Sequence, residues 1–302
     1  MKKIKLSRTS DSAGDSSAQV TGFYDHDTGS VQYLVADPQT SKAALIDVVM
    51  PFDHRSASTD NTSVDAILGF AETEGLEIEW ILDTHPHADH LMASSYLKER
   101  LGCPNAIGAK VKDISKLWHE KYNMPDAFDP EQDFDHLFKD GDSFKIGTLD
   151  VKVMLSPGHT LGSITYVVGD DAAFVHDTFM QPDAGTSRAD FPGGSADELY
   201  DSLQELLKLP DHTRLFIGHD YGTEFRKEPA WEATVQQHRR HNTHIGGGVS
   251  KEDFVALRTG RDKTLSLPDR MLHVLQMNLR AGKAPDPEND GNSYLKIPLN
   301  TF

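Results

Sequence analysis

The segment ILDTHPHADH, residues 81–90, places three histidines and two aspartates directly behind an apolar run. In an extended loop, residues two apart project to the same side, so His85 and His87 are expected to point into one pocket. The turn that follows brings Asp89 and His90 toward a neighbouring point. A single histidine in such a loop is usually a hydrogen-bonded structural residue, so a functional interpretation needs further segments of the same kind.

Three further segments repeat this arrangement, because each places polar side chains immediately after an apolar run of strand length. They are VMLSPGHT with His159, AAFVHDTF with His176 and Asp177, and RLFIGHDY with His219 and Asp220. Four strand ends that deliver histidine or aspartate in the same way are typical of a rigid sheet edge that positions metal ligands. The sequence therefore predicts a metal centre at this edge.

The cysteine content narrows the type of metal. Cys103 is the single cysteine of the sequence, so no intrachain disulfide can form and a metal site must use imidazole and carboxylate groups. This donor set suits zinc, manganese or non-haem iron, and the residue types alone do not choose among them.

Composition and charge limit the class of protein. The chain has 302 residues, of which 37% are hydrophobic, so it can bury an ordinary globular core. Its formal net charge of -17 argues against nucleic-acid partners, which are bound largely through lysine and arginine contacts to phosphates. The sequence lacks an apolar run near the roughly 18 residues of a membrane helix, and its N-terminus lacks the apolar region of a secretory signal. We therefore expect a cytoplasmic protein without membrane or nucleic-acid partners.

Strand-like and helix-like segments alternate along the chain, which predicts a layered α/β protein. Residues 1–17, rich in serine, aspartate and glycine, are expected to form a flexible tail. The remaining expected segments are a hairpin over 30–49, a helix over 62–75, a helix that begins near His90, a surface loop over 123–142, four successive strands between 144 and 177, a helix capped by Ser195, a buried strand at 214–220 and a mainly helical C-terminal part.

Four short motifs resemble those of the metallo-β-lactamase fold, and the resemblance covers roughly residues 20–245. In chain order they are THPHADH, SPGHT, HDT and GHD. Within that superfamily, DTFMQPDAGTSRADFPGGSADELYDSL is similar to persulfide dioxygenases, as are the C-terminal stretches LQMNLRAG and YLKIPLN. The resemblance implies an αββα sandwich, in which two mixed β-sheets are flanked by helices. It places this domain at residues 18–245 and a helical extension, packed on the same domain, at residues 246–302.

The resemblance also implies a ligand set. Persulfide dioxygenases hold one ferrous ion with two histidines and one carboxylate, which by motif are His85, His159 and Asp177. Three protein ligands leave positions open for a persulfide sulfur and dioxygen. Four residues match positions that bind a second metal in the dinuclear hydrolases of this fold, and we expect them to be hydrogen-bond partners around a single Fe(II) per chain: His87, Asp89, His90 and His219. Zinc or a second metal is compatible with the same donors.

Glutathione carries two carboxylates and one ammonium group, so an acidic protein needs local positive charge to bind it. By resemblance, Arg188 in SRADF lies beside the substrate, with Asp190 orienting it, and Tyr221 hydrogen-bonds the substrate. Further candidates rest on a looser match, namely Arg239, Asn278 and Arg280. For Arg239 a solvated helix face is an equally good interpretation.

The activity implied is oxidation of glutathione persulfide by O2 and water to sulfite and glutathione, carried out by a homodimer. The alternative enzyme is a hydrolase of the glyoxalase II type, in which two metals activate a hydroxide to attack a glutathione thioester. A metal-stabilised binding module without turnover is the alternative from a different class. A closed structural site uses four protein ligands, whereas this donor set leaves positions open, which favours an enzyme.

Overall fold

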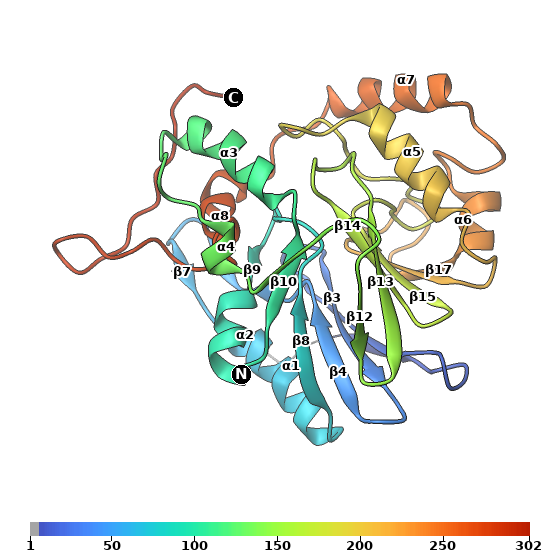
Figure 1. Ribbon diagram of the computed structural model, residues 1–302. Helices are drawn as coiled ribbons and strands as arrows, with labels where there is room; N and C mark the ends of the chain where they lie inside the picture. Colours follow the sequence, from blue (N-terminus) through green and yellow to red (C-terminus); the bar gives the residue numbers. More distant parts are fainter. Residues whose placement is uncertain (1–5) are drawn as a thin grey trace.

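The computed structural model describes residues 6–302, which form two β-sheets packed face to face with helices on both outer faces (Figure 1). The first sheet has the strand order β1-β2-β3-β4-β8-β10-β11, and the second has the order β12-β13-β14-β15-β16-β17. Each sheet is mixed, because β4, β8, β10 and β11 run parallel in the first and β15 runs parallel to β16 in the second. The expected αββα sandwich is therefore confirmed.

The strands have the following bounds. The first sheet comprises β1 (Ser7–Ser10), β2 (Gln19–Tyr24), β3 (Val31–Asp37), β4 (Lys42–Ile46), β8 (Glu77–Leu82), β10 (Asn105–Gly108) and β11 (His136–Phe138). The second comprises β12 (Ser143–Ile146), β13 (Leu149–Leu155), β14 (Ile164–Val168), β15 (Ala172–His176), β16 (Arg214–Ile217) and β17 (Glu232–Thr234). Two short ribbons pair β5 (Val49–Met50) with β9 (Leu91–Met92), and β6 (Phe52–Asp53) with β7 (Ser58–Thr59).

Strand β4 shows why the central strands are apolar. Ala44 and Ile46 lie in the core between the two sheets, whereas Ala43 and Leu45 lie in a second cluster beneath helix α1 (Thr62–Thr73). Side chains alternate between the two faces of a strand, so a strand covered on both faces is hydrophobic at every position. The sheet edge that carries the polar loops is thus held by strands buried on both sides.

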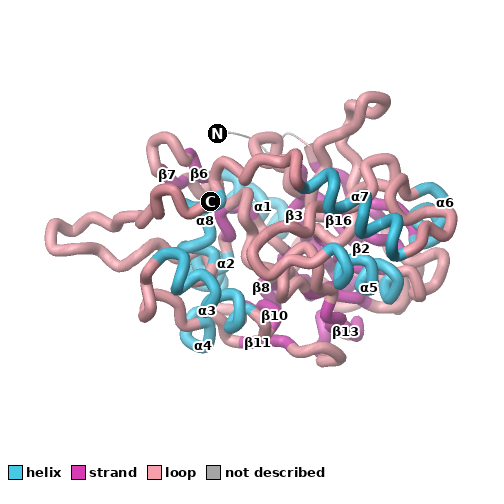
Figure 2. The backbone as a smooth tube through the Cα atoms, turned by 90° about the horizontal axis from the view of Figure 1, so that it is seen from above, coloured by secondary structure: helices cyan, strands magenta, loops and turns pink. Residues whose placement is uncertain are grey.

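The other helices are α2 (Ser94–Leu101), α3 (Val111–Tyr122), α4 (Pro130–Asp133), α5 (Ala196–Leu206), α6 (Val235–His241), α7 (Lys251–Asp262) and α8 (Met271–Asn278). Helix α5 begins as predicted, with the Ser195 hydroxyl accepting a hydrogen bond from the backbone N–H of Glu198. Helix α7 lies beside α5 on the outside of the second sheet (Figure 2), where the Phe254 and Tyr200 rings lie 5.6 Å apart. The C-terminal extension therefore packs on the sandwich.

Three expectations about local structure were wrong. The expected tail contains β1, whose residues pair with β2 at an exposed sheet edge, although the first five residues of that tail lie outside the described residues. The helix expected near His90 begins at Ser94 instead, because residues 91–92 form β9. The expected surface loop over 123–142 contains α4 and β11, and β11 extends the first sheet.

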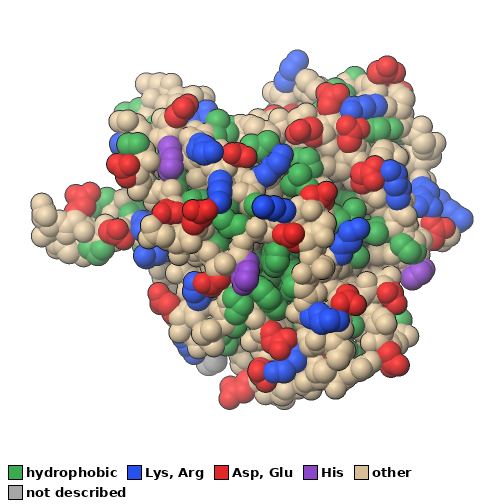
Figure 3. Space-filling view, in the orientation of Figure 1, with side chains coloured by type: hydrophobic (Ala, Val, Ile, Leu, Met, Phe, Trp, Pro, Cys, Tyr) green, Lys and Arg blue, Asp and Glu red, His purple; other side chains and the backbone are tan. Residues whose placement is uncertain are grey.

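None of the helices described within residues 6–302 is long and apolar enough to cross a membrane. On the face shown in Figure 3, lysine and arginine side chains are interspersed with aspartate and glutamate, and they form no continuous basic surface there.

Candidate metal centre

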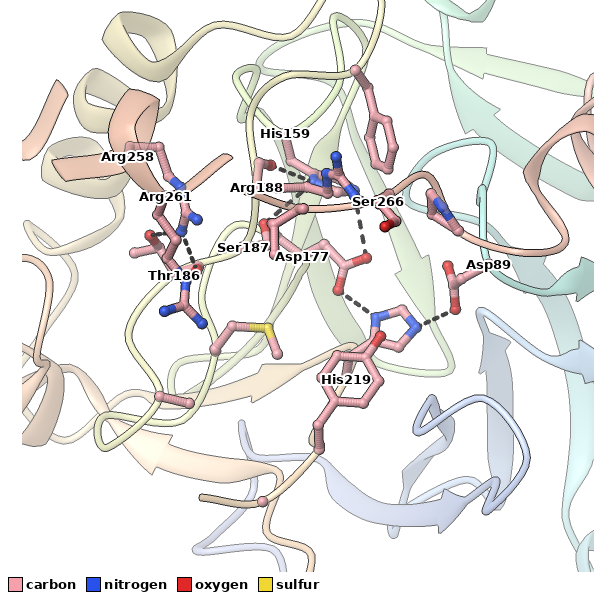
Figure 4. Close-up of a pocket in the computed structure, with 17 residues that line it drawn as sticks. Asp89, His159, Asp177, Thr186, Ser187, Arg188, His219, Arg258, Arg261 and Ser266 are labelled. Carbon is pink, nitrogen blue, oxygen red and sulfur yellow. Dashed lines mark hydrogen bonds and ion pairs between the residues drawn. The ribbon is translucent and has the colours of Figure 1, made fainter. Parts of the chain in front are cut away.

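The predicted ligands converge at one edge of the sandwich, where strands of both sheets end. His85 follows β8 of the first sheet, His159 lies between β13 and β14 of the second, and Asp177 and His219 follow β15 and β16. Ser30, directly before β3, forms an isolated β-bridge with His219, which joins the two sheets at this point. Figure 4 shows the side chains of His159, Asp177 and His219 around a common pocket.

His85 and His159 both face the same carboxylate oxygen of Asp177. Nε2 of His85 lies 3.7 Å from Oδ2 of Asp177, and Nε2 of His159 lies 3.6 Å from the same oxygen. Donor atoms bound to one ion at about 2.0–2.2 Å lie roughly 3.0–3.4 Å apart, so each histidine nitrogen lies a few tenths of an ångström beyond the separation from Asp177 that a shared ion requires. Nε2 of His85 is buried without a hydrogen-bond partner, which fits a nitrogen that a metal would bind.

Neighbouring groups orient both imidazoles. Nδ1 of His159 lies 2.8 Å from the backbone carbonyl of Arg188 and can donate to it, which leaves Nε2 as a free donor to a metal. Nδ1 of His85 lies 3.1 Å from the hydroxyl of Thr84. That threonine is held by Asp47, which accepts hydrogen bonds from its backbone N–H and its hydroxyl. Burial lowers the pKa of both histidines, so both imidazoles are neutral and able to bind a metal.

Asp177 presents its two carboxylate oxygens to different partners. Oδ2 faces His85 and His159, whereas Oδ1 lies 2.6 Å from Nδ1 of His219. Burial raises the pKa of Asp177, but the charges of His219 and His176 outweigh it and hold the pKa well below its usual range. The carboxylate is therefore ionised. In the same way, Asp177 and Asp89 overcome burial and raise the pKa of His219 well above its usual value.

The remaining predicted donors hydrogen-bond one another beside the triad. Nε2 of His87 lies 3.0 Å from Oδ1 of Asp47, and Nδ1 of His90 lies 3.1 Å from the Ser30 hydroxyl and 3.2 Å from Oδ2 of Asp89. Two sets of donor atoms here also lie within 4.8 Å of one another, as a second ion would need: His87, Asp89 and His90, and Asp89, Asp177 and His219.

A cavity of about 420 Å³ opens beside the centre, within the range of small-molecule sites. His159, Asp177 and His219 contribute to its wall, and so do Leu265, Ser266 and Pro268 of the C-terminal extension. The site thus combines metal donors from both sheets with a pocket that the extension completes.

The comparisons with known proteins agree with this architecture. The sequence profile of the metallo-beta-lactamase superfamily matches residues 27–219, which is more than half of the chain. The chain belongs to this superfamily. The matched range contains every donor described above, and it ends at His219.

Three curated relatives show where the chain lies within the superfamily. A beta-lactamase hydrolase-like protein of Xylella fastidiosa is 54% identical over 284 residues, which are 94% of this chain but 65% of the relative's length. Glyoxylase B2 of Dictyostelium discoideum is 38% identical and is covered over 97% of its length, with 94% of this chain aligned. The mitochondrial persulfide dioxygenase ETHE1 of Bos taurus is 29% identical, over 84% of this chain and 85% of the relative.

Among solved structures, ETHE1 from Myxococcus xanthus superposes with a TM-score of 0.67 at 28% identity, over 87% of this chain and 98% of that chain. The metallo-beta-lactamase fold is thus shared with proteins described as hydrolases and with ETHE1 proteins.

Two of the predicted substrate residues line the pocket of this superfamily member. Arg188 donates two hydrogen bonds to the carboxylate of Asp190 and one to the backbone carbonyl of Ser266, and its guanidinium lies 4.7 Å from the Phe191 ring centre. Tyr221 lies at the pocket rim, with its ring 5.8 Å from that of His219.

Three predicted substrate residues lie elsewhere. The guanidinium of Arg239 binds Asp211 and the backbone carbonyl of Leu207, so it faces the surface of α6 and not the pocket. Arg280 pairs with Asp286 outside the pocket, at 3.1 Å. Asn278 is buried, and its amide bonds the backbone of Met92, His87 and His90. Asn278 therefore stabilises the loop that carries His87, Asp89 and His90, and it does not line the pocket.

Two residues of the site were missed by sequence reasoning. Asp47 lies directly after β4 and binds Thr84 and His87, and its position after the apolar run AALI was the available signal. Arg261 lines the pocket from α7, where nothing in its sequence neighbourhood separates it from a solvated helix arginine. Both positions become apparent once the strand ends and the extension are placed in space.

Proposed function

We propose that this protein is a persulfide dioxygenase that uses a single ferrous ion and acts on glutathione persulfide. The observation that carries the proposal is the arrangement of Asp177, whose Oδ2 faces two histidine nitrogens while Oδ1 is taken by His219. Two histidines and one carboxylate with open positions are the donor set of non-haem iron oxygenases. The 28% identical structure of ETHE1 and the relative named persulfide dioxygenase support the same assignment.

A ferrous ion held by His85, His159 and Asp177 would supply positions at which persulfide sulfur and dioxygen meet. The protein groups position the ligands and the substrate. The carbonyl of Arg188 keeps His159 in the required tautomer, and Phe191 and Met180 line the pocket with apolar surface that limits access of water. Overall, glutathione persulfide, O2 and water give glutathione, sulfite and two protons.

The pocket presents positive charge to the substrate at the end formed by α7. Arg188 and Arg258 also line it, but each is already paired with an aspartate, Asp190 and Asp262 respectively. Among residues 6–302, Arg261 makes neither an ion pair nor a side-chain hydrogen bond. Figure 4 shows Arg258 and Arg261 on one side of Asp177 and Asp89 on the other. We assign Arg261 to a carboxylate of the glutathione portion, with the sulfur directed toward the metal donors.

Replacing Arg261 by alanine is expected to weaken glutathione binding about 10- to 100-fold, because hydrogen bonds to charged groups contribute roughly 1.5–3 kcal/mol. Isothermal titration calorimetry with glutathione measures this change on the metal-loaded protein. Arg240→Ala, an exposed arginine of α6 outside the pocket, is the matched control and should bind as wild type does. Equal affinities for the two variants would contradict the assignment of Arg261.

The competing function is a dinuclear hydrolase of the glyoxalase II type. It is favoured by the 38% identity to Glyoxylase B2 and by the second sets of donor atoms around Asp89. Such an enzyme would activate a hydroxide between two ions to cleave a glutathione thioester. Since both substrates contain glutathione, the pocket residues do not separate the two functions, whereas the metal and the co-substrate do.

Protein purified under anaerobic conditions should contain about one iron per chain and consume O2 when glutathione persulfide is added. Metal analysis and an oxygen electrode measure both quantities on the same sample, and sulfite is assayed as the product. A glutathione thioester should be left intact. Two metals per chain, thioester cleavage and an absence of O2 uptake would together establish the hydrolase instead.

A further inference from the structure

His176 lies at the centre of the donor cluster but has no role in the ligand set described above. It is the last residue of β15 and is 3% exposed. Its ring centre lies 4.5 Å from that of His87, 5.1 Å from that of His85 and 5.5 Å from that of His219. The side chain therefore fills the space between the metal triad and the second group of donors.

The backbone around His176 is adapted to hold this ring. The residue has a φ of 39°, in the left-handed region, which costs a non-glycine residue about 1–3 kcal/mol. A Cβ atom placed on Gly218, in the loop after β16, would lie 2.2 Å from the ring, so only glycine leaves room for the imidazole. Two positions at the ends of neighbouring strands thus accommodate one side chain, which indicates that the ring itself is needed there.

The two ring nitrogens of His176 face carboxylates that come from different sheets. Nε2 lies 3.3 Å from Oδ2 of Asp47, which follows β4, and Nδ1 lies 3.5 Å from Oδ1 of Asp177. Neither nitrogen forms a hydrogen bond of good geometry. Oδ1 of Asp177 consequently faces the nitrogens of His176 and His219, and Oδ2 alone faces the triad.

This orientation decides how many ions Asp177 can serve. A carboxylate that bridges two ions has to present one oxygen to each of them. Oδ1 is held by Nδ1 of His219 at 2.6 Å and flanked by Nδ1 of His176 at 3.5 Å. Donor atoms of Asp89, Asp177 and His219 lie within 4.8 Å of one another, so a second ion would have to displace His219 from Oδ1 to use them.

We propose that His176 restricts the centre to one ion, by occupying the space beside Oδ1 of Asp177 and keeping His219 on that oxygen. A ring nitrogen of His176 lies within 4.8 Å of donor atoms of His85, His87 and Asp177, and the proposal assigns it a positioning role beside the ion in place of a ligand role. The inference rests on the proposed function with a single ion, and it names the side chain that would exclude a second ion.

The test is the Co(II) stoichiometry of the full chain, measured by equilibrium dialysis with metal analysis. Wild-type protein should bind one Co(II) per chain, and His176→Gly should bind two, with the affinity for the first ion unchanged within about threefold. Glycine suits the left-handed conformation, so the substitution relieves backbone strain. His238→Ala, which removes a buried histidine of α6 outside the centre, is the control and should stay at one.

Several outcomes would overturn the inference. They are a single ion in folded His176→Gly, two ions in the wild type, or loss of the first ion in the variant, which would make His176 a ligand. If the glycine variant does not fold, His176→Asn replaces it, since asparagine tolerates the left-handed region and is smaller than histidine; it too should bind two ions. A single ion in folded His176→Gly, with O2 uptake by the wild type, would contradict this inference alone. An absence of O2 uptake by a wild type that binds one ion would contradict the dioxygenase proposal alone.

Discussion

Replacing Asp177 by alanine should remove the metal from the centre and lower turnover by about 10³-fold or more. The carboxylate is the shared partner of His85 and His159, and the other carboxylate that lines the pocket, Asp89, pairs with His219. A bound metal contributes several kcal/mol to the chemical step, and about 4 kcal/mol corresponds to 10³ in rate. Metal analysis of the purified variant and O2 consumption measure the two effects.

The matched control is Asp37→Asn. Asp37 is also buried and ionised, but it lies at the C-terminal end of β3 and accepts hydrogen bonds from Thr148 and Gln39, away from the centre. Its replacement should lower the free energy of unfolding while metal content and turnover stay near the wild-type values. A metal-replete Asp177→Ala protein would remove Asp177 from the ligand set.

Replacing Arg258 by methionine should lower the free energy of unfolding by about 3–5 kcal/mol, because it leaves the charge of Asp262 buried without its partner. Arg258 is 1% exposed, donates to Asp262 and to the backbone carbonyl of Thr186, and Asp262 in turn accepts from the N–H of Ala189. Helix α7 thereby holds the loop that carries Arg188. Chemical denaturation of the metal-free protein measures the loss.

The same substitution should also weaken substrate binding, since the loop between Thr186 and Ala189 supplies the carbonyl of Arg188 to His159 and lines the pocket. Arg240→Ala is again the control, because an exposed arginine without these contacts should change stability by less than about 0.5 kcal/mol. A loss below 1 kcal/mol in Arg258→Met would show that α7 does not stabilise the loop through this pair.

Much of the fold and the centre could be predicted, because both depend on patterns that are local in sequence. The alternation of buried faces along β4 makes a central strand recognisable, and a histidine or aspartate directly after such a strand has to lie at the sheet edge. The positions of His85, His159 and Asp177 follow from this rule together with the family motifs. The assignment of iron and of the substrate remains a proposal that the experiments above test.

What could not be predicted depends on contacts between distant segments. Arg239 and Arg261 are both arginines on amphipathic helices, and only the packing of α7 against α5 places one of them in the pocket. Strand β1 has the sequence SRTS, without the alternating apolar residues that mark a strand, because it pairs at an exposed edge. Asn278 lies 186 residues from Met92, to which it bonds, so its role in holding the donor loop leaves no local signal.

The donors of the centre come from both halves of the sandwich, with His85 on one sheet and His159 and Asp177 on the other. An ion bound there would cross-link the two layers without a covalent bond. Anything that binds the folded chain and not the unfolded chain raises the free energy of unfolding with the logarithm of the ligand concentration, and the melting temperature rises with it. The heat resistance of this protein in a cell would then rise and fall with the availability of its metal.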